Sequence, residues 1–233
     1  MAAAIALNIE TTGPNETTGP SDTTKSSLPI VLSHGVGSDT RVWDGLVPKL
    51  SETYRVIAWD QPGHGTSPEL PPDAYGPELP YDSLVSVVSS FERMILVGHS
   101  MGGYVSARYA IEYPSNVAAL VLIATGPGFR SPEAREKWNT DIRRLADKQG
   151  KPSRLLGLHA DSYVMDHLPE ILPPTLLIVG SEDKPFLSAT DYIEKKVPGI
   201  ERFTIEGAGH LVPSTHAAEV GALIEDFLRR HVG

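Results

Sequence analysis

The chain of 233 residues contains 40% hydrophobic and 21% charged residues, the composition of a globular protein with one large domain or two small ones. Its formal net charge of −9 disfavours nucleic acid and anionic membrane surfaces as main partners, because both reward clustered lysine and arginine. The absence of cysteine excludes disulfides, thiolate metal ligands and a cysteine nucleophile.

The N-terminal part contains one short apolar run and one polar stretch. Residues 4–9 are apolar enough for a first strand, and residues 11–27 form a polar segment in which Thr-Thr-Gly-Pro occurs twice. We expect the latter to be a flexible surface loop. The run at the start lacks a basic flank, and no apolar run approaches the roughly 18 residues of a membrane span. We therefore expect a cytoplasmic protein.

Apolar strands then alternate with amphipathic helices along the chain. The predicted strands are residues 29–32, 54–59, 94–97, 119–124, 175–179 and 202–205. The predicted helices are residues 42–50 (capped by Asp39 or Thr40), 81–91, 104–113, 132–148, 186–197 and 220–228, with a loop over 67–80. This alternation predicts an α/β fold with a mostly parallel central sheet and helices on both faces, and ligands bind such sheets at the carboxyl ends of the strands.

The sequence Gly98-His99-Ser100-Met101-Gly102 stands between a predicted strand and a predicted helix. Glycines flank the serine at positions where a Cβ atom would collide with neighbouring backbone. The flanking strand and helix raise a weak five-residue pattern to a strong indication of a nucleophilic serine at the tip of a sharp turn.

Two further strand ends supply the groups that a serine nucleophile needs. Ser100, Asp183 and His210 occur in the order serine, acid, histidine, and each follows a predicted strand. A base must take the proton of the serine, and an acid must hold the tautomer of the base. Glu182 is adjacent to Asp183 and is an alternative acid.

The seven other histidines have less suitable positions. We expect the side chain of His99 to point away from the cleft, His34 to support the loop that shapes the site, and His64 to form a structural hydrogen bond in a turn. The remaining four follow no strand and are expected to face solvent or to pack: His159, His167, His216 and His231.

A tetrahedral intermediate also needs hydrogen-bond donors for its oxyanion. The backbone N–H of Met101 stands at the start of the helix after Ser100, where free N–H groups and the helix dipole favour negative charge. The loop after the first buried strand should supply the second donor, for which we select the backbone N–H of Val36.

Five sequence motifs together resemble the α/β-hydrolase fold superfamily, in particular its esterase, lactonase and peroxidase-like group. They are His34-Gly35, Asp60-Gln61-Pro62-Gly63-His64-Gly65, Gly98-His99-Ser100-Met101-Gly102-Gly103, Gly180-Ser181-Glu182-Asp183 and Gly209-His210. The resemblance implies a Ser-Asp-His triad, no cofactor, and a substrate held between the sheet edge and a cap. A serine at position 100 argues against the epoxide-hydrolase and haloalkane-dehalogenase branches, which use aspartate there.

The cap that the resemblance implies is short in this chain. We expect a core domain of residues 1–128 and 173–233 and a helical cap insertion of residues 129–172, which suggests an open cleft. Five side chains are candidates to line the pocket or simply to pack the cap: Phe129, Trp138, Tyr163, Met165 and Leu211. No nucleotide-binding loop or metal-ligand spacing is present, so neither cofactor nor metal is predicted.

These features predict a serine hydrolase that cleaves a carboxylic ester or lactone of a small molecule through an acyl-enzyme on Ser100. Perhydrolysis with peroxide, or cleavage of a carbon–carbon bond beside a ketone, would use the same triad. A non-catalytic ligand receptor with this fold is the alternative from another class. The sequence does not indicate the physiological substrate or the oligomeric state.

Overall fold

A seven-stranded sheet forms the centre of the protein. The structure is a computed structural model that describes residues 5–14 and 28–232. The strands lie in the order β1-β3-β2-β4-β5-β6-β7, with β1 antiparallel to β3 and every other pair parallel. The predicted mostly parallel sheet is thus confirmed. The strand bounds are β1 Ile9–Thr12, β2 Ile30–Ser33, β3 Val56–Trp59, β4 Met94–His99, β5 Val117–Ile123, β6 Thr175–Gly180 and β7 Glu201–Ile205.

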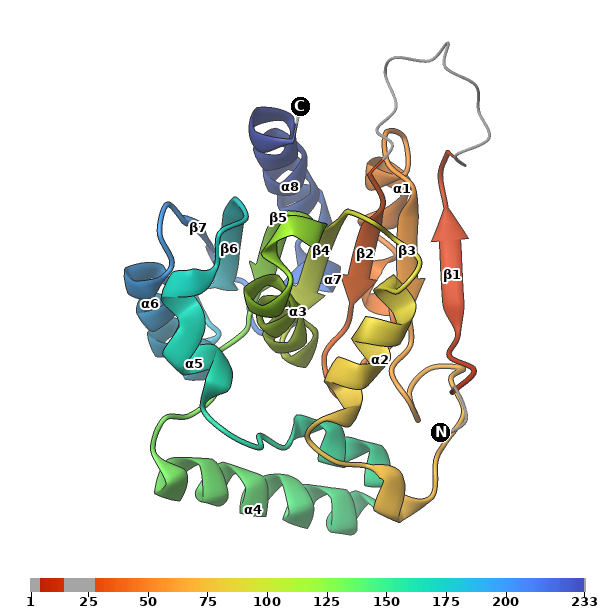
Figure 1. Ribbon diagram of the computed structural model, residues 1–233, viewed down its shortest axis with the longest axis vertical. Coiled ribbons are helices and arrows are strands. Elements are labelled where there is room, and N and C mark those ends of the chain that lie inside the picture. Colours follow the sequence, from red (N-terminus) through yellow and green to blue (C-terminus); the bar gives the residue numbers. More distant parts are fainter. Residues whose placement is uncertain (1–4, 15–27, 233) are drawn as a thin grey trace.

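Helices cover both faces of this sheet (Figure 1). The α-helices are α1 Val47–Leu50, α2 Leu79–Val88, α3 Met101–Glu112, α4 Pro132–Gln149, α5 Tyr163–His167, α6 Lys184–Lys196, α7 Val212–Thr215 and α8 Ala217–His231. Short 3-10 helices are η1 Thr40–Trp43, η2 Pro72–Ala74, η3 Pro114–Asn116, η4 Pro152–Gly157 and η5 Leu168–Glu170.

The core consists of two apolar layers, one on each face of the sheet. Alternate residues of a strand enter opposite layers: Ile30 and Leu32 pack with α8 and η1, whereas Val31 packs with α2 and α3. Strands β2 to β6 are buried along their full length because both faces are covered. This explains why they appear in the sequence as continuous apolar runs and not as alternating patterns.

The predicted first strand is wrong in its position. The strand β1 covers Ile9–Thr12, whereas the prediction placed the strand at 4–9 and a loop from Thr11 onward. All four residues of β1 are exposed, so this edge strand is held by backbone pairing to β3 and carries no apolar pattern. Of the two predicted segments, residues 4 and 15–27 lie outside the described part of the chain.

The single helix predicted over 42–50 is also wrong, because the segment forms two short helices, η1 and α1. Gly45 lies between them, and a Cβ atom there would stand 2.5 Å from Cβ of Ala217. Pro48 occupies the first turn of α1, where its missing N–H is tolerated, although it cannot continue a preceding helix. The predicted cap is present, since the Asp39 side chain accepts a hydrogen bond from Arg41 N at 3.0 Å.

Helix bounds elsewhere differ from the predictions by a few residues. The predicted loop over 67–80 contains η2 and the first two residues of α2, which begins at Leu79 with a proline in its first turn. Helix α3 begins directly after Ser100, three residues before the predicted range 104–113 and at Met101, where the assignment of the oxyanion donor had placed the helix start. Glycines at positions 102 and 103 concealed this start because glycine is a weak helix former.

The segment 129–172 contains α4, η4, α5 and η5. Helix α4 lies beyond the end of the sheet toward which the arrows of β2 and β4 point (Figure 1). In contrast, Val164, Leu168 and Ile171 pack in the same apolar layer as α3. Within residues 5–14 and 28–232, no helix combines the length and apolar character needed to cross a membrane.

The carboxylate of Asp60, directly after β3, connects three separate backbone segments. Its Oδ1 accepts a hydrogen bond from Thr40 N at 2.8 Å, and its Oδ2 accepts from Thr66 N at 3.0 Å and from Asn8 Nδ2 at 2.9 Å. Only 1% of Asp60 is exposed. The carboxylate therefore holds loops that flank the carboxyl ends of β2 and β3.

We predict that Asp60→Ala lowers the free energy of unfolding by at least about 1–3 kcal/mol, because buried N–H groups lose their acceptor. Urea unfolding followed by circular dichroism measures the effect. Asp73→Ala removes an exposed carboxylate on η2 and serves as the control, with an unfolding midpoint equal to that of the wild type. Equal midpoints for both variants would contradict the role of Asp60.

Candidate active site

Ser100 lies at the tip of a tight turn between β4 and α3. Its backbone has φ 54° and ψ −118°, which a residue with a side chain adopts only under constraint. A Cβ atom on Gly98 would collide with the carbonyl group of Gly102, and one on Gly102 would collide with that of Ser33. The prediction that this turn requires glycine on both sides of the serine is confirmed.

The structure brings Asp183 and His210 together at the carboxyl ends of β6 and β7. His210 Nδ1 donates a hydrogen bond to Asp183 Oδ2 at 2.8 Å. Because a carboxylate only accepts, Nδ1 carries the proton and Nε2 is left as the basic nitrogen. Phe186 stacks on the imidazole at 4.6 Å between ring centroids. The alternative acid, Glu182, is exposed, and His210 bonds to Asp183 and not to Glu182, so Asp183 is the carboxylate that the geometry favours.

Ser100 and His210 line the same cavity, which has a volume of about 610 Å³. The hydrogen bonds of the described residues do not include one between their side chains. Such bonds are often long in ligand-free active sites and tighten when substrate binds. The side chain of Ser100 and the imidazole of His210 therefore both face one cavity.

The loop after β2 passes directly beside the serine. A Cβ atom on Gly35 would lie 2.8 Å from Ser100 Cβ. Both predicted oxyanion donors, Val36 and Met101, line the cavity. His64 Nε2 accepts a hydrogen bond from Gly37 N at 2.8 Å, which fixes the far side of the loop.

His34 and His99 are buried and support this arrangement from within. The Nδ1 of His34 bonds to the carbonyl oxygen of Gly35 at 2.7 Å, and its Nε2 accepts from Gln61 N at 3.0 Å. His99 Nε2 donates to the carbonyl oxygen of His210 at 2.8 Å. Burial lowers the pKa of His34 to about 4 and that of His99 to about 3, so both are neutral at pH 7.

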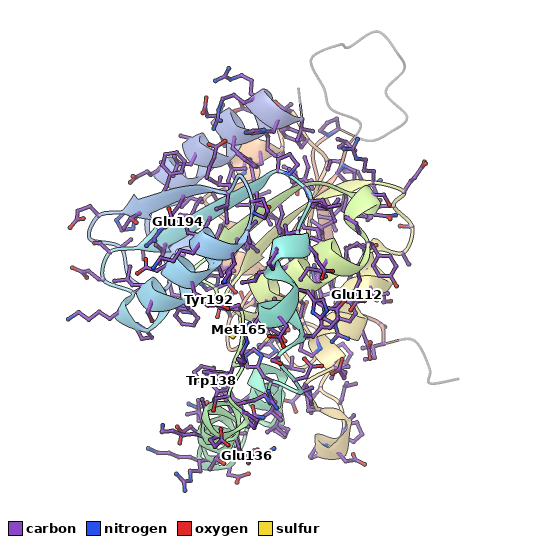
Figure 2. The ribbon with its side chains drawn as sticks, turned by 60° about the vertical axis from the view of Figure 1, so that its left-hand side comes forward. Glu112, Glu136, Trp138, Met165, Tyr192 and Glu194 are labelled. Carbon is purple, nitrogen blue, oxygen red and sulfur yellow. The ribbon has the colours of Figure 1, made fainter. Side chains whose placement is uncertain are left out.

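The cavity walls come from helices that are far apart in the sequence. Figure 2 shows Trp138, Met165 and Tyr192 on α4, α5 and α6, and all three line the cavity. Of the five predicted lining candidates, Phe129, Trp138 and Met165 do so. Tyr163 instead stacks on His167 at 4.2 Å, and Leu211 is about half exposed and lies outside the lining.

Several lining residues were missed from the sequence. They include Tyr104, Ile142, Arg154, His159 and Phe186. A helical repeat of four residues from Ser100 would have indicated Tyr104, whereas the others depend on how the loops fold back. The expectation for His159 allowed solvent exposure, but only 8% of this residue is exposed.

No group of three histidine, aspartate or glutamate side chains among residues 5–14 and 28–232 is placed to hold a metal ion. Among the polar groups that line the cavity are the hydroxyl of Ser100 and the imidazole of His210, which is bonded to the carboxylate of Asp183. Such a set performs nucleophilic acyl transfer with its own side chains.

This chain matches one protein family and is similar to several known proteins. Residues 29–152 match the protein family described as alpha/beta hydrolase fold. The abhydrolase domain-containing protein abhd-5.2 of Caenorhabditis elegans is 33% identical over 172 residues, which cover 68% of this chain and 37% of that protein. The chain thus spans well under half the length of this relative.

Two further relatives match nearly end to end. The pimeloyl-(acyl-carrier protein) methyl ester esterase of Aeromonas hydrophila is 34% identical over 245 residues, which cover 85% of this chain and 94% of that protein. A thermophilic esterase from Thermogutta terrifontis is similar in structure, with a TM-score of 0.76 and 26% identity over 97% of this chain and 94% of that chain.

We predict that the buried histidines reduce stability in mild acid. Burial, reinforced by Arg135, lowers the pKa of His159 to about 4 from its ordinary 6.5, and His34 and His99 behave similarly. Between pH 6.5 and pH 4 the unfolded chain binds more protons than the folded protein. The free energy of unfolding is therefore at its full value above pH 6.5 and falls as the pH drops toward 4. Each group contributes up to about 1.4 kcal/mol per pH unit, measurable by urea unfolding at several pH values.

His159→Phe removes one of these three imidazoles. The free energy of unfolding should then fall less steeply with decreasing pH, by up to the contribution of one group. Trp138→Phe changes the same cavity wall without removing a titrating group, so its slope should equal that of the wild type. A wild-type slope in His159→Phe would show that this imidazole is not held neutral.

Proposed function

The chain belongs to the alpha/beta-hydrolase family, and we propose that it is a serine hydrolase that cleaves a carboxylic ester or lactone of a small molecule. The observation that carries the proposal is the Asp183–His210 hydrogen bond at the cavity that the constrained Ser100 also lines. Relatives named as esterases support an ester as the bond that is cleaved.

The reaction begins with proton transfer from Ser100 Oγ to His210 Nε2, while Oγ attacks the carbonyl carbon of the ester. Asp183 holds the tautomer of His210 and stabilises the imidazolium that forms. The carbonyl oxygen becomes an oxyanion, for which the backbone N–H groups of Val36 and Met101 are the donors we assign.

Collapse of the intermediate breaks the bond to the alcohol oxygen, which takes the proton from His210. The acyl group remains on Ser100 Oγ as an ester. A water molecule then gives a proton to His210 and attacks the acyl carbonyl. His210 passes this proton to Ser100 Oγ as the bond from Oγ to the acyl carbon breaks, which releases the acid and restores the serine. No cofactor takes part in this sequence of steps.

Segment 129–172 acts in this proposal as the cap over a core of residues 1–128 and 173–233. Support comes from Phe129, Trp138 and Met165, which lie in the segment and line the cavity. The cytoplasmic location and the lack of nucleic-acid or membrane partners stay predictions.

We predict that Ser100→Ala lowers kcat/KM for hydrolysed esters by at least about 10⁴-fold, because the nucleophile is lost. A panel of p-nitrophenyl esters from acetate to octanoate measures this rate. A serine-directed phosphonate should add one label to the wild type and none to Ser100→Ala, as seen by mass spectrometry. If no ester is hydrolysed above the Ser100→Ala background, a receptor that binds without turnover replaces the proposed enzyme.

Asp183 and Glu182 offer a matched pair of neighbouring carboxylates. Asp183→Asn should lower kcat/KM by about 10³–10⁴-fold, since an amide no longer favours the productive tautomer of His210. Glu182→Gln changes an exposed side chain in the same turn and should retain wild-type activity. The measurement is kcat/KM of both variants on one ester that the wild type hydrolyses. Equal kcat/KM values for the two variants would refute the assignment of Asp183 as the acid.

A further inference from the structure

His159 lines the catalytic cavity but has no part in the reaction described above. We propose that it is a specificity-determining residue, which donates a hydrogen bond from Nε2–H to an acceptor oxygen on the substrate, such as a ketone or ether oxygen remote from the scissile ester. The inference deepens the proposed function and rests on it.

The backbone of His159 is clamped from α4. Asn139 Oδ1 accepts a hydrogen bond from His159 N at 2.9 Å, and Asn139 Nδ2 donates to His159 O at 2.9 Å. The Asn139 side chain is itself buried. A buried amide that makes both bonds to one residue fixes that residue in position, which is what recognition of a ligand atom needs.

The imidazole ring is held as firmly as the backbone. It meets the ring of Tyr104 edge-on, with centroids 4.6 Å apart and an interplanar angle of 82°. It meets Phe129 in the same manner at 5.5 Å and 79°. These two contacts, together with Trp138 at 6.3 Å between ring centroids, hold the imidazole in one orientation in the cavity wall.

The two ring nitrogens have different surroundings. Nδ1 is buried without a hydrogen-bond partner and faces Gly128, where a Cβ atom would lie 3.4 Å from it. Nε2 is not among the fully buried atoms without a partner, so it keeps accessible surface, and we take it as the nitrogen that faces the cavity. The ring is neutral, since burial lowers its pKa to about 4. An unpaired buried N–H is rarer in proteins than an unpaired acceptor, so the proton belongs on Nε2.

This arrangement discriminates between substrates of equal shape. A substrate with an oxygen opposite Nε2 satisfies the donor, whereas an all-carbon isostere leaves it unpaired in an apolar wall. A site built to hydrogen-bond a substrate rejects the analogue that lacks the polar atom. A neutral hydrogen bond contributes about 0.5–1.5 kcal/mol, so discrimination of about 3- to 10-fold is expected at this position.

Two isosteric ester pairs test the proposal and separate the two possible positions of the oxygen. The acyl arm compares p-nitrophenyl 4-oxopentanoate with p-nitrophenyl 4-methylpentanoate. The alcohol arm compares 2-oxopropyl butanoate with 2-methylpropyl butanoate. For each pair the ratio of kcat/KM, ketone over hydrocarbon, is measured in the wild type and in His159→Phe.

We expect the ratio of at least one pair to fall by about 3- to 10-fold in His159→Phe, which keeps an aromatic ring but has no donor. Working from the change in the ratio cancels the electronic effect of the ketone on ester reactivity. His167→Phe replaces a histidine that stacks on Tyr163 outside the cavity, and it should leave both ratios at their wild-type values.

Ratios that are the same in the wild type and in His159→Phe for both pairs would overturn the proposal while the esterase activity itself stands. If the wild-type protein hydrolysed none of the esters, the proposed function itself would be overturned. If circular dichroism shows that His159→Phe does not fold, His159→Leu carries the same expectation, because it also lacks a donor and keeps an apolar side chain.

Discussion

The close contact between the serine turn and the end of β2 is the constraint on which the site depends. Ser100 holds a φ of 54°, and Gly102 brings α3 against the carbonyl group of Ser33. Such a conformation costs about 1–3 kcal/mol and persists only where its surroundings enforce it. Here β2 and β4 are buried along their full length and are paired to each other. One contact therefore places the serine in the cavity wall and sets the loop after β2 beside it.

Buried neutral histidines maintain this contact. His34 and His64 bond to the loop on either side of Val36, and His99, next to the serine, donates to the backbone of His210. Desolvation lowers the pKa of all three, so none adds a positive charge at pH 7. Like charges near an imidazole disfavour its protonated form. The neutral histidines thus support the loops without placing a charge beside His210, the base of the proposed reaction.

The fold was largely predictable from the sequence because strands β2 to β6 are continuous apolar runs that end in unusual turns. The order of Ser100, Asp183 and His210, each after a predicted strand, placed them at one edge of the sheet. Strand β1 was misplaced because its exposed residues carry no apolar signal. The helix over 42–50 was misjudged because its apolar spacing outweighed the breaks at Gly45 and Pro48. In both cases the spacing of apolar residues in the sequence did not indicate the secondary structure that the folded chain adopts.

The cavity wall was the least predictable part, because many of its side chains belong to segment 129–172, where contacts within the segment position them. Trp138 Nε1 donates to Gly157 O at 2.8 Å, and Asn139 clamps His159, so α4 is bonded mainly to the chain that follows it. The strand ends take no part in these bonds. Changes in α4 can therefore alter which substrates fit without disturbing the Ser100 turn or the Asp183–His210 pair. Reaction type and substrate choice accordingly depend on separate sets of interactions in one protein.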